Sequence, residues 1–186
     1  RLVTASWDQT AKIWDAASGE LLANLQGHDT EITALATSRD GGRVATTSGD
    51  KTTRVWDAAT GELLTTLRGH EDNIEDVDFS PDGARLATAG WDHTARLWDA
   101  DTGRLLATFI DHDDIVTKLV FSPDGARVAT ASQDALARVW DADTDDSIAT
   151  IAGHRNDVRR VVFAAGDARV VTTSLDKTAK VWNADT

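Results

Sequence analysis

The chain has 186 residues, a formal net charge of −12 and no cysteine, so it is one domain or part of one, without disulfides, thiolate metal sites or cysteine nucleophiles. The acidic charge is spread over the whole chain and makes nucleic acids and anionic membranes poor partners, because their phosphate groups would be repelled. No apolar run approaches the roughly 20 residues that span a bilayer, so a soluble, cytoplasmic protein is expected.

In chain order, residues 1–18 predict a hairpin: an apolar run, a turn around Asp8 and a second short strand. From residue 20 on, each 42-residue period carries four short candidate strands, which the first period places at 21–25, 32–38, 43–48 and 52–57. Their lengths and spacing are typical of an all-β meander, and no stretch keeps the 3.6-residue period of a helix. We divide the chain into a partial repeat, 1–18, and four repeats, 19–60, 61–102, 103–144 and 145–186.

A tryptophan recurs every 42 residues, with an aspartate six residues before it and, in the last four copies, a histidine 28 residues before it. The tryptophans are Trp14, Trp56, Trp98, Trp140 and Trp182. The aspartates are Asp8, Asp50, Asp92, Asp134 and Asp176, and the histidines are His28, His70, His112 and His154. A period this regular indicates a repeat architecture, in which units stack because one unit cannot bury its apolar faces alone.

Turn signals separate the predicted strands. TSRDGG and FSPDGAR join the second and third strands of the first three periods, where Pro81 and Pro123 fix φ and Gly83 and Gly125 accept a positive φ. An SG or TG pair makes another tight turn at 18, 60 and 102. The fourth period has TDDS at 144–147 and FAAGDAR at 163–169 instead, so both of its turns are expected to be looser or of a different type.

With these Gly-His, Ser-Pro-Asp-Gly, Asp and Trp-Asp signals at these spacings, the whole chain resembles the WD-repeat family. The resemblance implies an all-β fold, a β-propeller of four-stranded antiparallel blades. In that family each sequence period supplies the outermost strand, d, of one blade and the inner strands a, b and c of the next. The chain is thus expected to form strands b, c and d of one blade, three complete blades, and strands a, b and c of a last blade.

The resemblance also implies a buried network in each repeat, in which the histidine, a hydroxyl, the turn aspartate and the tryptophan share hydrogen bonds. The implied networks are His28, Asp50 and Trp56; His70, Asp92 and Trp98; His112, Asp134 and Trp140; and His154, Asp176 and Trp182. The hydroxyl is expected from Thr46 or Ser48, Thr88, Thr130 or Ser132, and Thr172 or Ser174. A buried carboxylate is costly unless it accepts hydrogen bonds. Because the same pair recurs in every repeat, we interpret it as structural and not as catalytic or metal-binding.

Interaction surfaces in the resembled family commonly lie on the narrow face, at the residue before the turn aspartate and at the start of strand a. The implied partner-binding residues are Trp7, Glu31, Thr33, Asn73, Glu75, Trp91, Ile115, Thr117, Gln133, Asp157, Arg159 and Leu175. Gly49 and Gln133 show that the repeat does not require bulk before the aspartate, and tryptophan is favoured in binding hot spots. The alternative is that Trp7 and Trp91 cover the central channel or pack on a neighbouring blade.

Other residue patterns carry no chemistry. The acidic turn at 141–147 alternates aspartates like a calcium loop, but Asp146 stands where that loop needs glycine and Ala152 where it needs glutamate. His93, the one histidine outside the repeat position, is expected to be exposed. No catalytic residue, cofactor or metal site is therefore predicted, and the chain is not expected to be an enzyme.

We expect a non-catalytic platform that binds a protein or peptide through the narrow face, with an acidic rim that selects a basic or mixed partner. Two alternatives stay open. An architectural fragment would complete a ring with another copy, as a homo-oligomer, because exposed apolar blade faces usually find a partner. A sensor or autoinhibitory module of a larger bacterial signalling protein is the other.

Overall fold

The structure, a computed structural model, describes residues 1–164 and 168–185. Its regular elements are eighteen strands in five antiparallel sheets, and within the described ranges there is no helix that could cross a membrane. The N-terminal sheet has three strands, β1 (Leu2–Ala5), β2 (Thr10–Trp14) and β3 (Leu21–Gln26). The C-terminal sheet also has three, β16 (Val158–Phe163), β17 (Arg169–Ser174) and β18 (Ala179–Asn183).

Three four-stranded sheets lie between them. The second sheet consists of β4 (Ile32–Thr37), β5 (Arg43–Ser48), β6 (Thr52–Asp57) and β7 (Leu63–Arg68). The third consists of β8 (Ile74–Phe79), β9 (Arg85–Gly90), β10 (Ala95–Asp99) and β11 (Leu105–Phe109). The fourth consists of β12 (Val116–Phe121), β13 (Arg127–Ser132), β14 (Ala137–Asp141) and β15 (Ser147–Ile151).

This arrangement confirms the expected fold class and the incomplete sheet at each end. In every sheet, strands that are consecutive in sequence pair with each other, as a meander requires. The first sheet lacks an innermost strand, and the last sheet lacks an outermost strand, while the middle three have all four. The strands predicted at 43–48 and 52–57 have the observed bounds, and the other two of that period differ by one residue at their C-terminal ends.

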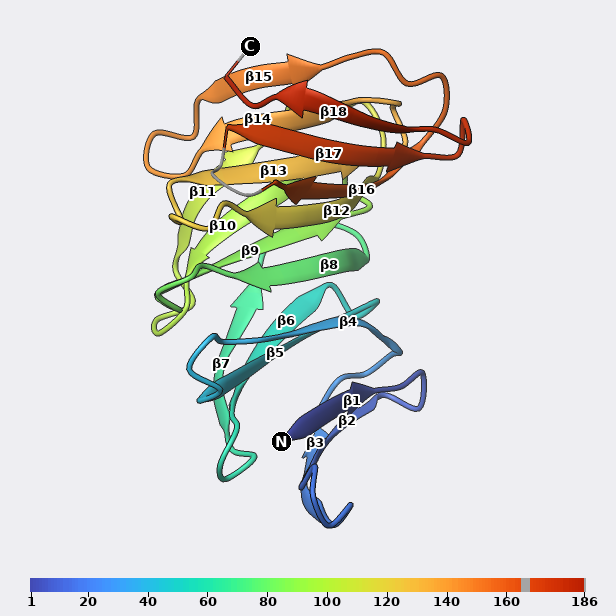
Figure 1. The fold of residues 1–186 in the computed structure, drawn as a ribbon. Coiled ribbons are helices and arrows are strands. Elements are labelled where there is room, and N and C mark those ends of the chain that lie inside the picture. Colours follow the sequence, from blue (N-terminus) through green and yellow to red (C-terminus); the bar gives the residue numbers. More distant parts are fainter. Residues whose placement is uncertain (165–167, 186) are drawn as a thin grey trace.

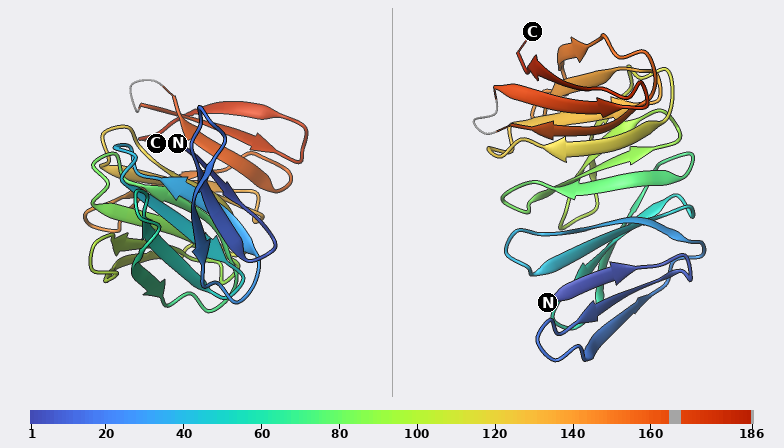
Figure 2. Two further views of the ribbon diagram at one scale, coloured as in Figure 1. Left: turned by 90° about the horizontal axis from the view of Figure 1, so that it is seen from below. Right: turned by 45° about the vertical axis from the view of Figure 1, so that its right-hand side comes forward.

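The sheets follow one another in a stack, with the N-terminal sheet at one end and the C-terminal sheet at the other (Figure 1). The innermost strands β4, β8, β12 and β16 are neighbours in this order. They line a common hollow of about 410 Å³ with residues that include Leu35, Val77, Leu119 and Val161. Seen along the stack, the sheets fan out around this inner side (Figure 2).

The core lies between the sheets and is divided into four clusters of buried side chains. In each cluster, the tryptophan that recurs every 42 residues packs against alanines and branched residues of the preceding sheet. Trp98, for example, packs with Ala45, Val55 and Leu67 of the second sheet. Burying one such aliphatic side chain contributes about 1.5–3 kcal/mol. Because both faces of a sheet are apolar, each sheet is stabilised by packing against its neighbours in the stack.

The turns explain why the strands end where they do, and one turn of the fourth period departs from its equivalents. Gly83 and Gly125 have φ of 74° and 77°, as the turn sequence predicted. In the fourth period, Asp145 has a φ of 58° at the position that Gly61 and Gly103 occupy in their repeats. Asp145 thus keeps the left-handed conformation, which aspartate tolerates better than most residues do. The bonds from Gly61 N to Asp57 O and from Gly103 N to Asp99 O have no counterpart from Asp145 N to Asp141 O among the described residues, so this turn is looser, as expected. The prediction for the turn at 163–169 falls largely on 165–167, which lie outside the described residues.

Candidate functional site

Each of the last four sheets contains a chain of hydrogen bonds that links tryptophan, threonine, histidine and aspartate. In the third sheet, Trp98 Nε1 donates to Thr88 Oγ1 at 2.8 Å. The Nε2 and Nδ1 atoms of His70 lie 2.8 Å from Thr88 Oγ1 and 2.8 Å from Asp92 Oδ2 respectively. An ionised carboxylate only accepts, so Nδ1 carries the proton and Nε2 accepts from the threonine hydroxyl. The indole N–H at one end of this network can only donate and the carboxylate at the other end can only accept, so the donor in every bond between them is fixed.

The same contacts recur in the other repeats, with histidine-to-aspartate distances of 2.7–2.8 Å. The hydroxyl comes from threonine each time, at positions Thr46, Thr88, Thr130 and Thr172. The serines that remained as alternatives have other partners; Ser48 Oγ, for instance, donates to the Thr30 carbonyl at 3.2 Å. The first sheet has Trp14 bonded to Thr4 and Asp8 bonded to Thr10, without a histidine.

The turn aspartates of these networks stay ionised although they are largely buried. Burial by itself raises the pKa of Asp92, but hydrogen bonds from His70, from the Glu71 amide and from Thr94 outweigh it and hold that pKa below its usual range. The Asp50 carboxylate behaves alike, with His28 and Thr52 as its main donors. All the acceptor sites of such a carboxylate are directed at groups of its own sheet. The hydrogen bonds of these carboxylates thus tie together groups of the fold itself.

The predicted partner-binding residues lie at one end of the sheets. A backbone hydrogen bond ties the residue before the turn aspartate to the start of the innermost strand in four sheets, as in Trp91 N to Asn73 O at 2.8 Å. The other three bonds of this kind are Gly49 N to Glu31 O, Gln133 N to Ile115 O, and Leu175 N to Asp157 O. The two sets of predicted positions therefore form one rim, which we call the narrow rim.

On the narrow rim, the structure brings four of the predicted residues together around a hollow of about 500 Å³. Trp7, Glu31, Thr33 and Glu75 line it, and we call it the Trp7 hollow. The Trp7 side chain is 85% exposed, so it packs on no neighbouring sheet among the described residues. Trp91 is less exposed, and its Nε1 donates to Glu75 Oε2 at 2.8 Å. Packing on a neighbouring sheet is thus excluded for Trp7, and Trp91 holds one wall of the hollow in place.

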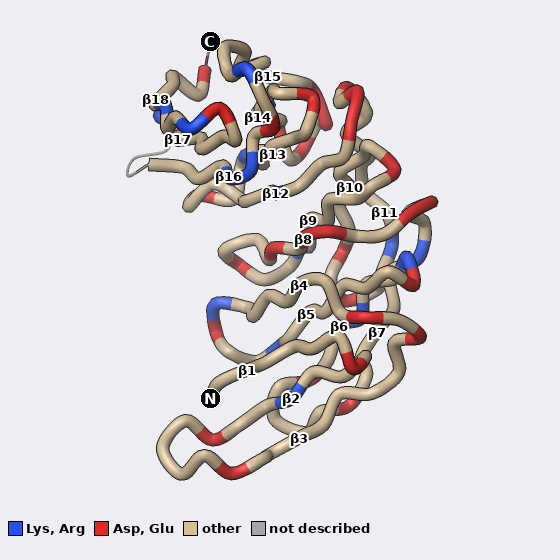
Figure 3. The backbone as a smooth tube through the Cα atoms, turned by 90° about the vertical axis from the view of Figure 1, so that its right-hand side faces the viewer, with Lys and Arg blue, Asp and Glu red and all other residues tan. Residues whose placement is uncertain are grey.

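A second hollow, of about 330 Å³, adjoins the first and shares Thr33 and Glu75 with it. Of the predicted residues, Thr117 and Arg159 also line this second hollow, and Arg160 stands beside them. The remaining predicted residues are Asn73, Ile115, Gln133, Asp157 and Leu175, which hold their places on the rim through the backbone bonds described above. Leu175 is exposed, and Arg159 Nε lies 3.9 Å from Asp157 Oδ2. Asp and Glu outnumber Lys and Arg along the loops of the molecule (Figure 3).

Sequence reasoning missed a charged cluster on the inner strands. Asp76 is buried, and its Oδ1 and Oδ2 accept from Lys118 Nζ at 2.6 Å and from the Leu119 amide at 3.0 Å. Asp78 Oδ2 accepts from the Phe121 amide at 2.9 Å. The sequence contains one sign of this cluster. At the repeat positions of Asp76 and Asp78, the second sheet has Ala34 and Ala36, so the two carboxylates are not required by the repeat. Both carboxylates thus join β8 to β12 where two sheets meet.

The Asp78 carboxylate predicts a pH effect on stability. Burial raises the pKa of Asp78 to about 6, against the opposing hydrogen bond from the Phe121 amide. Between pH 4 and pH 6 the Asp78 carboxyl consequently binds more protons in the native state than in the unfolded state, so its contribution to the free energy of unfolding falls as the pH rises. Asp78→Asn should flatten this slope and raise the free energy of unfolding at pH 7 by about 1–2 kcal/mol, a value reduced because the side chain is partly exposed. Urea unfolding at pH 4, 5, 6 and 7 would measure it, and a slope unchanged by the substitution would contradict the assignment.

The described residues contain no group of three or more His, Asp or Glu side chains placed to hold a metal ion. His93 is exposed, with a φ of 65° in its hairpin turn. The carboxylate of Asp141 is directed into its own turn, where it accepts from the amides of Asp143 and Thr144. The acidic turn is therefore held by its first aspartate.

Five repeated sheets with a tryptophan in each and one shared rim define a protein of the β-propeller class. A comparison of the sequence with known protein families finds a match to the family described as "WD domain, G-beta repeat". The matched residues are 1–15, 19–57, 61–99, 103–141 and 145–183. These matches cover most of the chain, so the protein belongs to the WD-repeat family. Proteins of this family are generally protein–protein interaction scaffolds and typically not enzymes.

Individual relatives match over about one repeat. A segment of 39 residues is 54% identical to the Denticleless protein homolog of Gallus gallus and covers 21% of this chain but 5% of that protein. The WD repeat-containing protein 37 of Mus musculus is 49% identical over 37 residues, 20% of this chain and 8% of that protein. The aligned segments are therefore small parts of both relatives, and the similarity reflects the repeat.

Proposed function

We propose that the protein is a non-catalytic platform that binds a protein or peptide on its narrow rim, with the Trp7 hollow as the main anchoring site. The observation that carries this proposal is the Trp7 side chain, 85% exposed beside the carboxylates of Glu31 and Glu75. A large indole in water gains free energy when a partner covers it. The repeat itself requires no bulk at this position, as Gly49 shows.

The charges of the hollow select the chemistry of the partner. Glu31 and Glu75 stand on two different sheets, and Trp91 fixes the second of them through its indole N–H. A lysine or arginine side chain that enters the hollow can pair with these carboxylates while its methylene groups lie on the indole of Trp7. The net charge of −12 also attracts a basic segment over a distance of about 10 Å at moderate ionic strength. We infer that the partner presents a basic residue next to an apolar one.

Trp7→Ala should weaken such binding at least about tenfold and leave folding unchanged, because the side chain touches little of its own molecule. The experiment selects displayed random peptides on the wild-type protein and then measures the affinity of the enriched peptides by calorimetry. We expect lysine or arginine beside aromatic or aliphatic residues, and a lower affinity for Glu31→Gln and Glu75→Gln. Leu64→Ala on β7, exposed but on an outer strand, serves as the matched control. Peptides that are not basic, or that bind Trp7→Ala as well as the wild type, would refute the proposal.

A second candidate function, assembly with further copies of the chain, is favoured by the exposed faces of the first and last sheets. It uses a different surface from the narrow rim.

A further inference from the structure

The four contacts between neighbouring sheets are built from the same two positions of the repeat. One position lies on strand c of a sheet, and the other lies on strand b of the next sheet, two residues before the network threonine. The pairs are Ile13 with Val44, Val55 with Leu86, Leu97 with Val128, and Val139 with Val170. All eight side chains are at most 1% exposed. One interface is therefore repeated four times within the chain.

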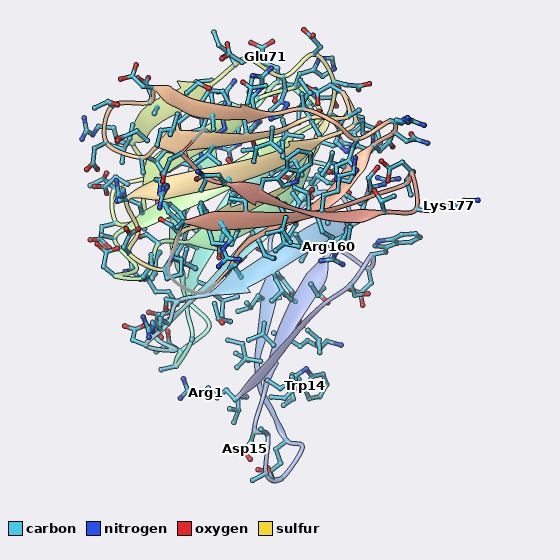
Figure 4. All side chains as sticks on the ribbon, turned by 45° about the horizontal axis from the view of Figure 1, so that its top comes forward. Arg1, Trp14, Asp15, Glu71, Arg160 and Lys177 are labelled. Carbon is cyan, nitrogen blue, oxygen red and sulfur yellow. The ribbon has the colours of Figure 1, made fainter. Side chains whose placement is uncertain are left out.

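The outward faces of the first and last sheets carry the same two positions without a neighbour. Leu2 occupies the position of Val44 on the first sheet and is 57% exposed. Val181 occupies the position of Val139 on the last sheet and is 61% exposed. Trp14 is also partly exposed, whereas Trp56 is 3% exposed. Figure 4 shows Trp14 and Arg1 on the first sheet, at one end of the molecule.

A polar contact accompanies the apolar pair at these interfaces. Arg1 Nη1 donates to the Ala58 carbonyl of the second sheet at 2.8 Å, and Arg85 Nη1 donates to the Ala142 carbonyl of the fourth sheet at 3.0 Å. Arg169 holds this repeat position on the last sheet and is exposed. The matching carbonyl on a first sheet is that of Ala16, two residues after Trp14.

We propose that a second copy of the chain docks head to tail, with the first sheet of one copy on the last sheet of another. Leu2 and Trp14 then cover Val181, and Arg169 reaches the Ala16 carbonyl, so that the part of the internal interface made by strands b and c forms a fifth time. A second copy is the occupant because these positions on the two faces are the two halves of one contact, whose counterparts pack together four times within the chain. The contact joins unlike faces, so it produces a ring or an open helical chain. It goes beyond the proposed function, because the narrow rim remains free.

Two variants test the direction of docking. In Leu2→Glu the carboxylate would be buried against Val181, and in Val181→Glu it would be buried against Leu2, so each should weaken self-association by about 100-fold or more. Sedimentation velocity should show concentration-dependent association of the wild-type chain, whose mass is 20.0 kDa, and monomers for each variant alone. An equimolar mixture of the variants should form a dimer and nothing larger, because each retains one intact face. Higher salt should strengthen the association, because both copies are acidic.

Leu64→Glu on β7 is the matched control, since Leu64 is 52% exposed and lies outside both faces. It should associate like the wild type. Both test residues are exposed in the single chain, so the variants should fold, which circular dichroism would verify. Three results would each overturn the proposal: a wild-type chain that stays monomeric at the highest concentration, a variant that still associates by itself, or a mixture that forms no dimer. Loss of peptide binding on the narrow rim would leave this result unchanged, so the two proposals fail independently.

Discussion

Replacing Trp98 with alanine is expected to lower the free energy of unfolding by about 3–5 kcal/mol, a large part of the 5–15 kcal/mol that stabilises an ordinary domain. The indole is 2% exposed and fills the space between the second and third sheets, where it packs with Val55 and Leu67. Its Nε1 also supplies the first hydrogen bond of the network, to Thr88 at 2.8 Å. The substitution leaves a cavity and an incomplete network at the same place.

The chain contains its own control for this experiment. Trp14 occupies the same repeat position and donates a hydrogen bond to Thr4 at 2.9 Å, but no sheet packs on its outward face. Trp14→Ala should therefore cost about 1 kcal/mol or less in the monomer. Urea unfolding followed by circular dichroism would compare the two variants at one low protein concentration, because any association would add stability. Equal losses would show that packing between sheets contributes little.

The regular elements were predictable because their signals are local. Glycine and proline mark the turns, alternation marks the strands, and the 42-residue period repeats both signals. The loss of glycine at Asp145 indicated a looser turn, and the Asp145 amide lacks the backbone bond that the amides of Gly61 and Gly103 make. The aspartate side chain suits the left-handed conformation, with φ at 58°, so the backbone keeps its path.

The choice between two hydroxyls needed the register of the strands. Thr46 and Ser48 lie on the same face of β5, so alternation alone cannot separate them. Trp56 pairs with Val44, and its indole spans two residues along the strand to Thr46 Oγ1 at 2.9 Å. Ser48 lies closer to the turn and accepts from the Asp50 amide at 3.1 Å.

Contacts between sheets could not be predicted from the sequence for a different reason. Asp76 and Lys118 are 42 residues apart, at the same position of two repeats, and Lys118 Nζ donates to Asp76 Oδ1 at 2.6 Å. A sequence pattern shows that such positions are equivalent, but only the stacking order and offset of the sheets bring them together. The Trp7 hollow depends on the same information, because Glu75 stands two sheets away from Trp7. A sequence repeat thus predicts the structure of a single sheet well, but it predicts the contacts between neighbouring sheets poorly.

Replacing Asp92 with alanine is expected to lower the free energy of unfolding by about 2–4 kcal/mol, because it leaves buried donors without an acceptor. Oδ2 accepts from His70 Nδ1 at 2.8 Å and from the Glu71 amide at 2.9 Å, and the side chain of His70 is 0% exposed. Asp8 is the matched control, since it accepts from Thr10 in the same turn but has no histidine above it. Asp8→Ala should change stability little by comparison.

The pH dependence separates this network from simple packing. Buried hydrogen bonds hold the pKa of Asp92 below its usual range, so the native state binds fewer protons than the unfolded state at low pH. The stability that the carboxylate contributes is present above about pH 4, the unfolded pKa, and is lost as the pH falls further. The difference between the wild type and Asp92→Ala should therefore shrink below pH 4, whereas the difference for Trp98→Ala, which removes packing and no charge, should stay nearly constant. Unfolding measured from pH 3 to pH 7 tests both, and parallel curves for Asp92→Ala would assign its effect to lost packing alone.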